Sequence, residues 1–295
     1  MDIAFNINPL GLEGLGATLT SLIRNCAKPD TLKIWFLCCD CSSEHKGRIK
    51  DLLENEHFNG LTEFIDFDAR KIFGHLKPLH GDWTGYGRLL IPDYIKSNVV
   101  LYLDADLIVS VDVALLKGFN FNGNFLAAVP GGQVKYALER NFLINDLKLS
   151  PDLGYFNSGV LLLNLPQWRA LGIEAEWRKI ANQYPNDLMA IDQTLLNAVC
   201  KGRFAHLPPN FNNAWCPGDM MPVDAQQSII HFVGSPKPWD VFGKTLHDGY
   251  ETWRSYNTRD WKKQFNKVTW NKLLRTWKIK NSILIKMKKK ILKTG

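Results

Sequence analysis

The first 103 residues alternate between segments typical of strands and segments typical of helices. The strand-like segments are short apolar runs, whereas the helix-like segments repeat apolar residues every three or four positions. In chain order we expect a strand at 3–7, a helix at 15–26, strands at 33–39 and 61–68 with a helix at 46–56 between them, a helix at 85–95 and a strand at 98–103. This order predicts an α/β fold with a mostly parallel sheet that is covered by helices on both faces.

Two aspartates directly follow the last of these strands, in the stretch VVLYLDADLIV. Residues two apart in an extended chain project to the same side, so we expect the carboxylates of Asp104 and Asp106 to converge and Ala105 to face away. Two close anions repel each other unless a cation lies between them, and hard oxygen ligands suit Mg²⁺ or Mn²⁺. The pair therefore indicates either a metal site or a polar turn that caps the next helix.

A second strand end carries groups that complement the two aspartates, in SIIHFVGSPKPWD at 228–240. The imidazole of His231 can bind Mn²⁺, Gly234 lets the backbone approach a phosphate, and Lys237 supplies a positive charge. By itself, His231 is more typical of a hydrogen-bonded core histidine. The two stretches together predict a metal and diphosphate site at the carboxyl ends of strands, where α/β sheets bind their ligands.

A third segment, NDLMAIDQTLLNAVCKG, predicts a helix that starts at residue 188 with Asp187 as its N-cap. Asp192 then lies on the apolar, inward face of that helix. Because a buried carboxylate needs partners, Asp192 either makes a structural hydrogen bond to a neighbouring loop or accepts hydroxyl groups of a sugar.

The composition is that of a soluble globular protein. Of the 295 residues, 45% are hydrophobic and 22% are charged. The N-terminus lacks the pattern of a secretory signal, and no window approaches the roughly 18 uninterrupted apolar residues of a membrane span. The six cysteines lack the spacing of a zinc site, so we expect free or buried thiols in a reducing compartment, which is the cytoplasm.

Basic residues are concentrated at the C-terminus. Residues 261–295 hold twelve Lys or Arg and no acidic residue, so residues 1–260 carry 24 basic against 29 acidic groups, a balance of −5 in a chain of net charge +7. This asymmetry predicts an appended segment that meets a polyanion, either nucleic acid or an anionic membrane.

The same tail has the pattern of an amphipathic helix. Its large apolar residues recur at helical spacing among the lysines: Trp270, Leu273, Leu274, Trp277, Leu284, Met287 and Ile291. Tryptophans at headgroup depth and basic residues near an anionic surface are the profile of an interfacial helix. A helix packed on the domain and a nucleic-acid arm are the alternatives; we expect membrane docking and no nucleic acid.

Five segments between residues 84 and 239 resemble glycosyltransferase family 8, the retaining enzymes that include bacterial lipopolysaccharide α-galactosyl- and α-glucosyltransferases. The segments are TGYGRLL, VVLYLDADLIV, YFNSGVLLLNLPQWR, AIDQTLLN and HFVGSPKPW, in the family's order. The resemblance implies a GT-A fold, a single Rossmann-like domain over residues 1–260 that binds a nucleotide-sugar and uses Mn²⁺, with Mg²⁺ as the alternative. Residues 261–295 would then be an appended membrane-docking tail.

The resemblance also implies roles for individual residues. The metal ligands correspond to Asp104, Asp106 and His231, and the diphosphate contacts to Gly234 and Lys237. The donor-sugar contacts correspond to Arg88, Asn157 and Asp192, and the side chain near the anomeric carbon to Gln193. Asp192 and Gln193 are the expected catalytic residues.

The loop after the first strand departs from the family pattern. The family usually has small and acidic residues there, followed by an aromatic residue that stacks on uracil, whereas FNINPLGLEG has Asn6, Asn8 and Gly11 at the comparable places. We expect Asn6, Asn8 and Ala105 to contact the donor.

These features predict a retaining transferase that moves galactose or glucose from a UDP-sugar to a saccharide acceptor. The expected acceptor is the lipopolysaccharide core or another glycolipid, at the inner face of the cytoplasmic membrane. Because the amide of Gln193 is a poor nucleophile, we expect the acceptor hydroxyl to attack on the face that the diphosphate leaves. The alternative is a non-catalytic nucleotide-sugar or glycan-binding protein; a dehalogenase-type phosphatase is disfavoured, since DADLI lacks the threonine of D-x-D-x-T.

Overall fold

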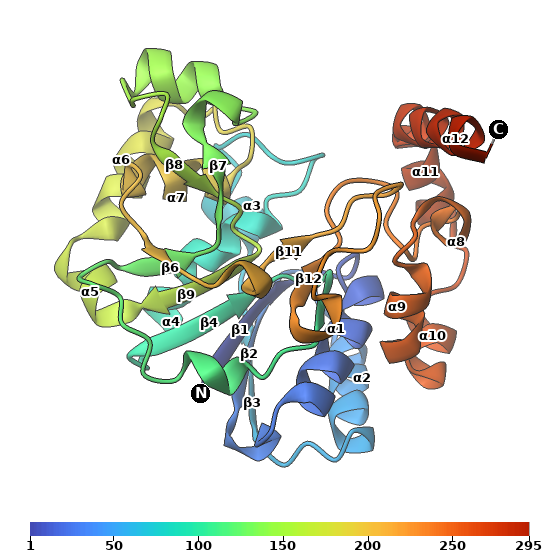
Figure 1. The fold of residues 1–295 in the computed structure, drawn as a ribbon. Helices are drawn as coiled ribbons and strands as arrows, with labels where there is room; N and C mark the ends of the chain where they lie inside the picture. The colour runs from blue at the N-terminus through green and yellow to red at the C-terminus, as the bar shows by residue number, and fades with distance from the viewer. Residues whose placement is uncertain (295) are drawn as a thin grey trace.

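A seven-stranded sheet with the order β10-β6-β9-β4-β1-β2-β3 forms the centre of the computed structural model (Figure 1). The structure describes the backbone of residues 1–294 and their side chains except those of Asn271 and residues 289–294. The strands are β1 (Asp2–Ile7), β2 (Lys33–Cys38), β3 (Leu61–Asp66), β4 (Val99–Leu103), β6 (Leu126–Ala128), β9 (Val160–Asn164) and β10 (Ala205–His206). The pairs β1–β2, β2–β3, β1–β4 and β6–β10 are parallel, which confirms the predicted, mostly parallel sheet.

Strand β9 runs antiparallel to both of its neighbours, β4 and β6. β4 therefore has β1 as a parallel neighbour and β9 as an antiparallel one. The sequence of β9, VLLLN, is apolar almost throughout and carries no information about the direction of pairing. The antiparallel strand brings the segment just before it, residues 157–159, next to the end of β4.

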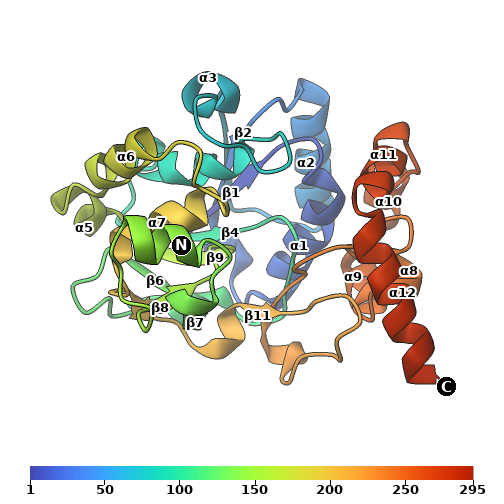
Figure 2. The same cartoon turned by 90° about the horizontal axis from the view of Figure 1, so that it is seen from above.

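The two faces of the sheet are buried in separate cores, as the period of two along a strand requires. Ile3 and Phe5 of β1 pack in one core with α1 (Leu12–Asn25) and α2 (Ser43–Asn55). Ala4 and Tyr102 pack in the other core, under α3 (Ala69–Phe73), α4 (Ile91–Tyr94), α5 (Leu165–Ala170), α6 (Ile173–Gln183) and α7 (Asp192–Cys200). Figure 2 shows these helices on the two sides of the sheet.

Two smaller sheets lie at the carboxyl end of the central strands. One contains β11 (Asn213–Ala214), β12 (Ile229–His231) and β5 (Leu107–Val109), and the other pairs β7 (Pro130–Gln133) with β8 (Gly154–Phe156). β12 is antiparallel to β5, with His231 opposite Leu107. This pairing places the end of β12 beside the end of the turn that holds the two aspartates, and the backbone N–H of Phe232 donates to the carbonyl of Asp106.

Two predicted helices differ in the structure. Residues 84–90 form a 3₁₀ helix before the short α4, because the glycines in TGYGRLL disfavour an α-helix and Pro92 starts a new one. The helix predicted from residue 188 begins only at Asp192, and Asp187 does not cap it. Ile191 has a φ of 47°, which interrupts the backbone before that helix, so Asp192 lies in the first turn of α7.

β12 is followed by α8 (Gly243–Leu246), α9 (Tyr250–Tyr256), α10 (Arg259–Phe265), α11 (Trp270–Lys278) and α12 (Lys280–Thr294), on the side of the molecule where α1 lies (Figure 2). Of these helices, α9 and α10 contact α1. The expected boundary at residue 260 lies within α10, whose Trp261 is buried against α1 and donates a hydrogen bond from Nε1 to the carbonyl of Leu12, at 2.9 Å. The expected amphipathic tail is two helices with a break at Ile279, and the side chain of Ile291 lies outside the described residues. Within the described part of the chain, no helix has both the length and the apolar character needed to cross a membrane.

Candidate active site

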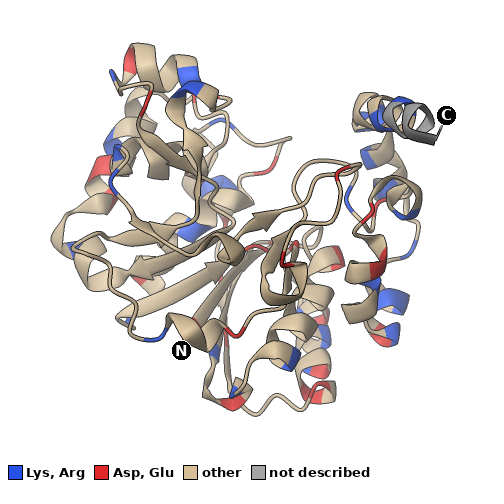
Figure 3. Ribbon diagram, in the orientation of Figure 1, with Lys and Arg blue, Asp and Glu red and all other residues tan. Residues whose placement is uncertain are grey.

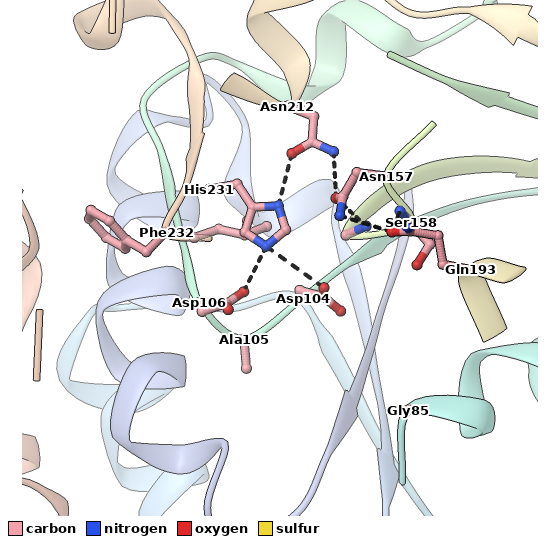
Figure 4. Close-up of polar contacts among 12 residues, drawn as sticks. Gly85, Asp104, Ala105, Asp106, Asn157, Ser158, Gln193, Asn212, His231 and Phe232 are labelled. Carbon is pink, nitrogen blue, oxygen red and sulfur yellow. Dashed lines mark hydrogen bonds and ion pairs between the residues drawn. The ribbon is translucent and has the colours of Figure 1, made fainter. Parts of the chain in front are cut away.

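The structure brings Asp104, Asp106 and His231 together at the carboxyl ends of β4 and β12 (Figure 4). Nε2 of His231 lies 3.2 Å from Oδ1 of Asp106 and 3.9 Å from Oδ2 of Asp104. One possible ligand atom from each of the three residues lies within 4.8 Å of the others. Ala105 projects the other way, toward the start of α1, as the alternation of side chains predicts.

Gly159 allows this close approach. Its carbonyl accepts a hydrogen bond from the backbone N–H of Asp104, at 2.8 Å, which fixes the two segments against each other. A Cβ atom on Gly159 would lie 2.3 Å from Cε1 of His231 and 2.9 Å from Oδ2 of Asp104. A larger residue at position 159 would therefore push the imidazole and the carboxylate apart.

The three residues fit a divalent cation. Oδ1 of Asp106 is buried and accepts no hydrogen bond from the described residues, and it faces the same space as Nε2 of His231. Burial would raise the pKa of Asp106, but Lys237 and His231 outweigh it and hold the pKa well below its ordinary value. An ionised carboxylate with an unused oxygen, beside a second carboxylate and an imidazole, is a donor set that suits Mn²⁺ or Mg²⁺.

Lys237 lies beside the carboxylates. Its Nζ is 2.7 Å from Oδ2 of Asp106 and also contacts the carbonyl of Phe232, and its backbone N–H donates to Oδ2 of Asp240, at 2.7 Å. Gly234 lies in the same turn and has a φ of 75°, a conformation that favours glycine. A Cβ atom placed on Gly234 would face Pro217 rather than the carboxylates.

Arg88 connects the predicted metal ligands with the predicted sugar contacts. It is buried, with Nη2 3.0 Å from Oδ1 of Asp104 and Nε 2.9 Å from Oδ2 of Asp192. Asp192 also accepts a hydrogen bond from the hydroxyl of Ser158, at 2.9 Å. Burial raises the pKa of Asp192 to about 6, against the opposing effect of Arg88. Asp192 therefore makes a structural hydrogen bond to a neighbouring loop, which is one of the two alternatives predicted from the sequence.

Gln193 and Asn157 face each other (Figure 4). Oε1 of Gln193 accepts hydrogen bonds from Nδ2 of Asn157, at 3.0 Å, and from the backbone N–H of Ser158, at 3.1 Å. Both lone pairs of that oxygen are therefore engaged. Because an amide oxygen with two donors is an even poorer nucleophile than a free one, the arrangement disfavours covalent attack by Gln193.

Asn6 lies near the end of β1, and Asn8 lies in the loop that follows. Asn6 donates from Nδ2 to the carbonyl of Thr84, at 2.5 Å, and its Oδ1 is buried without a partner. Asn8 donates to Asp82, at 2.7 Å, and accepts from the N–H of Gly11, at 2.9 Å. These residues line the edge of the sheet at the end of β1, next to the start of α1.

Sequence reasoning missed three residues that complete the site: Ser158, Gly159 and Asn212. The first two belong to the NSG triplet of YFNSGVLLLN, whose small residues between two strands could have indicated a close approach of the backbone. Asn212 lies in NFNNAWC, which has no distinguishing pattern, and only the fold shows that its side chain reaches both Asn157 and His231.

Comparisons with known proteins identify a family that matches most of the chain. A model of the family described as "Glycosyl transferase family 8" matches residues 2–242. The chain is 28% identical over 258 residues to the lipopolysaccharide 1,3-galactosyltransferase of Salmonella typhimurium, covering 82% of this chain and 74% of that protein. It is 26% identical to general stress protein A of Bacillus subtilis, over 82% of this chain and 88% of that protein.

Solved structures show the same fold. A crystal structure of the galactosyltransferase LgtC in complex with donor and acceptor sugar analogs is similar with a TM-score of 0.70 and 25% identity, over 92% of this chain and 98% of that one. A structure of an active-site mutant of LgtC has a TM-score of 0.72 and 22% identity, over 89% of this chain and 99% of that one. The similarities confirm the fold and the family resemblance that the sequence motifs predict.

Proposed function

The chain belongs to glycosyltransferase family 8, and from this premise we propose that it transfers a hexose, galactose or glucose, from a UDP-sugar to a saccharide acceptor with retention of configuration. The observation that carries the proposal is the group of Asp104, Asp106 and His231 beside Lys237, at the carboxyl ends of strands β4 and β12. In an α/β sheet this edge is where a ligand binds, and its charges suit a diphosphate with a divalent cation.

Asp104, Asp106 and His231 would hold the cation, which we propose to be Mn²⁺, with Mg²⁺ as the alternative. The buried, unpartnered Oδ1 of Asp106 supports this assignment. When bound, the cation supplies Lewis-acid stabilisation of the negative charge that develops on the departing diphosphate.

The chain's own side chains supply the remaining functions. Lys237, next to Asp106, can move its ammonium group to a phosphate oxygen and stabilise the same developing charge, with Gly234 in the same turn. Arg88 holds Asp192 in place, which leaves the second carboxylate oxygen of Asp192 to accept hydroxyl groups of the donor sugar. Asn157 and Gln193 lie next to this pair, on the side where the anomeric carbon would be.

We propose that the acceptor hydroxyl attacks on the face from which the diphosphate departs. The bond from the anomeric carbon to the phosphate oxygen breaks, the bond to the acceptor oxygen forms, and the departing phosphate oxygen takes the acceptor's proton. The doubly engaged Oε1 of Gln193 supports this route over a covalent intermediate. Asn6, Asn8 and Ala105 are the proposed contacts of the nucleoside part of the donor.

The acceptor class is proposed from the relatives. They include the lipopolysaccharide 1,3-galactosyltransferase of Salmonella typhimurium and the lipopolysaccharide glucosyltransferase WaaO of Escherichia coli. We propose a saccharide of the lipopolysaccharide core, or a similar glycolipid, as the acceptor of this chain.

We further propose that residues 261–295 dock the catalytic domain, residues 1–260, on an anionic membrane, at the cytoplasmic face of the inner membrane. Lys272 pairs with Glu13 at 2.9 Å and Arg275 with Asp240 at 2.7 Å, so α11 lies against the domain through its basic residues. The aromatic side chains face solvent, with Trp270 73% and Trp277 69% exposed. Lys and Arg are spread along α11 and α12 (Figure 3). Exposed tryptophans beside basic residues support a lipid surface over nucleic acid.

The transfer reaction is tested by incubating the full chain with Mn²⁺, a panel of UDP-sugars and a lipopolysaccharide acceptor, and measuring the release of UDP. We expect turnover with UDP-galactose or UDP-glucose, its loss in Asp106→Ala, and wild-type turnover in Asp51→Ala, a matched change on the exposed face of α2. Tight binding of a UDP-sugar without turnover on any acceptor would instead favour the non-catalytic binding protein.

Docking is tested by co-sedimentation with vesicles that contain anionic or only neutral lipid. The matched variants are Trp270→Ser combined with Trp277→Ser, and Tyr136→Ser, which removes an aromatic ring that is 76% exposed elsewhere. We expect the wild type and Tyr136→Ser to pellet with anionic vesicles, less so as salt rises, and the double variant to stay in solution. Equal pelleting of all three proteins would rule out docking through the tail.

A further inference from the structure

A continuous chain of side-chain hydrogen bonds links His231 to a buried carboxylate, that of Glu139. Nδ1 of His231 is 3.0 Å from Oδ1 of Asn212, and Nδ2 of Asn212 is 3.1 Å from Oδ1 of Asn157. Nδ2 of Asn157 is 3.0 Å from Oε1 of Gln193, and Nε2 of Gln193 is 2.7 Å from the hydroxyl of Tyr155. That hydroxyl is 2.5 Å from Oε1 of Glu139, which is 2% exposed.

Two backbone N–H groups fix the donor-to-acceptor direction of this series of hydrogen bonds. An N–H group can only donate, so the N–H of Gly159, 2.9 Å from Asn157, identifies the contacted amide atom of Asn157 as Oδ1. The N–H of Ser158 identifies Oε1 of Gln193 in the same way. The orientations of both amides are therefore set by the backbone rather than by a choice between oxygen and nitrogen.

The orientation of Asn212 follows from that of Asn157. Because Oδ1 of Asn157 is an acceptor, the atom of Asn212 that faces it must be the donor Nδ2. The oxygen of Asn212 then faces Nδ1 of His231, which must carry the proton. We propose that Asn212 is a positioning residue that holds a proton on Nδ1 of His231, so that Nε2, which faces Asp104 and Asp106, is the ring nitrogen available to a metal.

This role matters because the surroundings of Nε2 favour the opposite tautomer. Nε2 lies 3.2 Å from Oδ1 of Asp106 and 3.9 Å from Oδ2 of Asp104, so two anions attract a proton to that nitrogen. A proton on Nε2 would bond to Asp106 and occupy the nitrogen that a metal needs. The hydrogen bond to Asn212 offsets this attraction by holding the proton on the other side of the ring.

At the Glu139 end, the series of hydrogen bonds also has a fixed direction from donor to acceptor. Tyr155 accepts a hydrogen bond from Gln193, so its only proton is directed at Glu139, and burial together with the Glu139 carboxylate raises the pKa of Tyr155 well above its ordinary value. Thr194 also donates to the same oxygen of Glu139, at 3.2 Å. The series of hydrogen bonds therefore ends at the carboxylate of Glu139, which accepts hydrogen bonds from Tyr155 and Thr194.

The inference rests on the proposed metal site, but its first test does not depend on a metal or on transfer. Long-range ¹H–¹⁵N spectra of the metal-free, uniformly ¹⁵N-labelled full chain, recorded at alkaline pH, distinguish a protonated from an unprotonated ring nitrogen. The His231 signals are assigned by their loss in His231→Gln. We expect a protonated Nδ1 in the wild type; an Nδ1 without a proton would overturn the proposal.

Variants at position 212 separate positioning from a merely structural role. Asn212→Leu cannot accept the Nδ1 proton, and we expect the proton to move to Nε2; Asn212→Asp keeps an acceptor there and should keep the wild-type tautomer. Asn213→Leu is the matched control, since the side chain of the neighbouring Asn213 donates to the carbonyl of Val223 and this variant should behave as the wild type. An unchanged tautomer in a folded Asn212→Leu protein would also overturn the proposal.

The second readout is the affinity for Mn²⁺ alone, followed by the electron paramagnetic resonance of the free ion. We expect about a ten- to hundredfold loss in Asn212→Leu and none in Asn213→Leu. Equal losses in Asn212→Leu and Asn212→Asp would indicate a general packing role and contradict the assignment. If the wild type shows the expected tautomer but no affinity for Mn²⁺, the proposed metal site fails while the tautomer assignment stands.

Discussion

Nζ of Lys237 lies 2.7 Å from Oδ2 of Asp106, so an internal cation already neutralises one of the proposed metal ligands. Lys237 comes from the loop after β12 and Asp106 from the turn after β4, and the ion pair ties these two segments together. The ammonium group and a divalent ion therefore compete for the same carboxylate, although both favour a bound diphosphate.

This competition predicts opposite effects in Lys237→Met. Mn²⁺ alone should bind at least as tightly as to the wild type, because the competing ammonium group is gone. Transfer should fall roughly 10- to 100-fold, which corresponds to the loss of one charge-assisted hydrogen bond to the leaving phosphate. Mn²⁺ titration and UDP release measure the two effects, and the exposed Lys244→Met on α8 is the control. A parallel loss of both properties would contradict the competition.

A methyl group on Gly159 should damage the site with little effect elsewhere. In Gly159→Ala the new Cβ would lie 2.3 Å from the imidazole of His231, so the ring must move away from Asp104. We expect a stability loss of about 1–3 kcal/mol from overpacking, and a clear drop in Mn²⁺ affinity. In Gly131→Ala the nearest atom is 3.6 Å away, an ordinary contact, so this control should keep both properties. Mn²⁺ affinity that is unchanged in Gly159→Ala would show that the site adjusts.

Arg275 of α11 should influence donor binding through Asp240. The buried carboxylate of Asp240 accepts two hydrogen bonds from Arg275 and one from the backbone N–H of Lys237. In Arg275→Ala the carboxylate of Asp240 loses one of these two partners. We expect the KM for the donor to rise roughly fivefold, which corresponds to a loss of about 1 kcal/mol in binding free energy. Lys278→Ala removes the same charge from the same helix without this contact. If both variants change the KM equally, the effect comes from net charge.

His247 predicts how stability depends on pH. Its side chain is buried between Trp215 and Phe232, its Nδ1 accepts from the N–H of Gly249, and burial lowers its pKa to about 4, helped by the charge of Lys237. Between pH 6.5 and 4 the unfolded chain therefore binds a proton that the native chain does not, so stability falls as the pH falls through this range.

Below about pH 4, the free energy of unfolding has lost the full contribution of His247, about 3 kcal/mol. His247→Phe should remove this part of the pH dependence, whereas His75→Phe at an exposed position should retain it. Urea unfolding at several pH values between 4 and 7.5 measures the slope. A slope that is unchanged in His247→Phe would assign the pH dependence to other groups.

The sequence predicts the elements of the site that are local in the chain. The apolar run before Asp104 marks a buried strand, and its end marks the binding edge, because both depend only on side-chain pattern and strand direction. The same holds for His231 at the end of β12. The inward position of Asp192 is also correct, although the helix starts four residues later than its pattern suggests.

What the sequence does not reveal depends on long-range packing. The positive φ of Ile191 is imposed by its surroundings, since a β-branched residue does not favour that conformation. The direction of β9 is set by its connections rather than by its apolar residues. Asn212 acquires its partners only because residues 157–159, 212 and 231 meet in the folded chain, and an isolated asparagine in a loop gives no indication of this.

The group of Asp104, Asp106 and His231 also has a consequence for protein synthesis. The two aspartates leave the ribosome about 125 residues before the histidine, a delay of roughly 6–25 s at ordinary elongation rates. During that time the nascent chain has neither the imidazole nor Lys237 to hold a cation between the carboxylates. A divalent ion that needs all three of the proposed ligands would therefore bind only after β12 has paired with β5, so metal loading would follow the folding of this domain and could not start it.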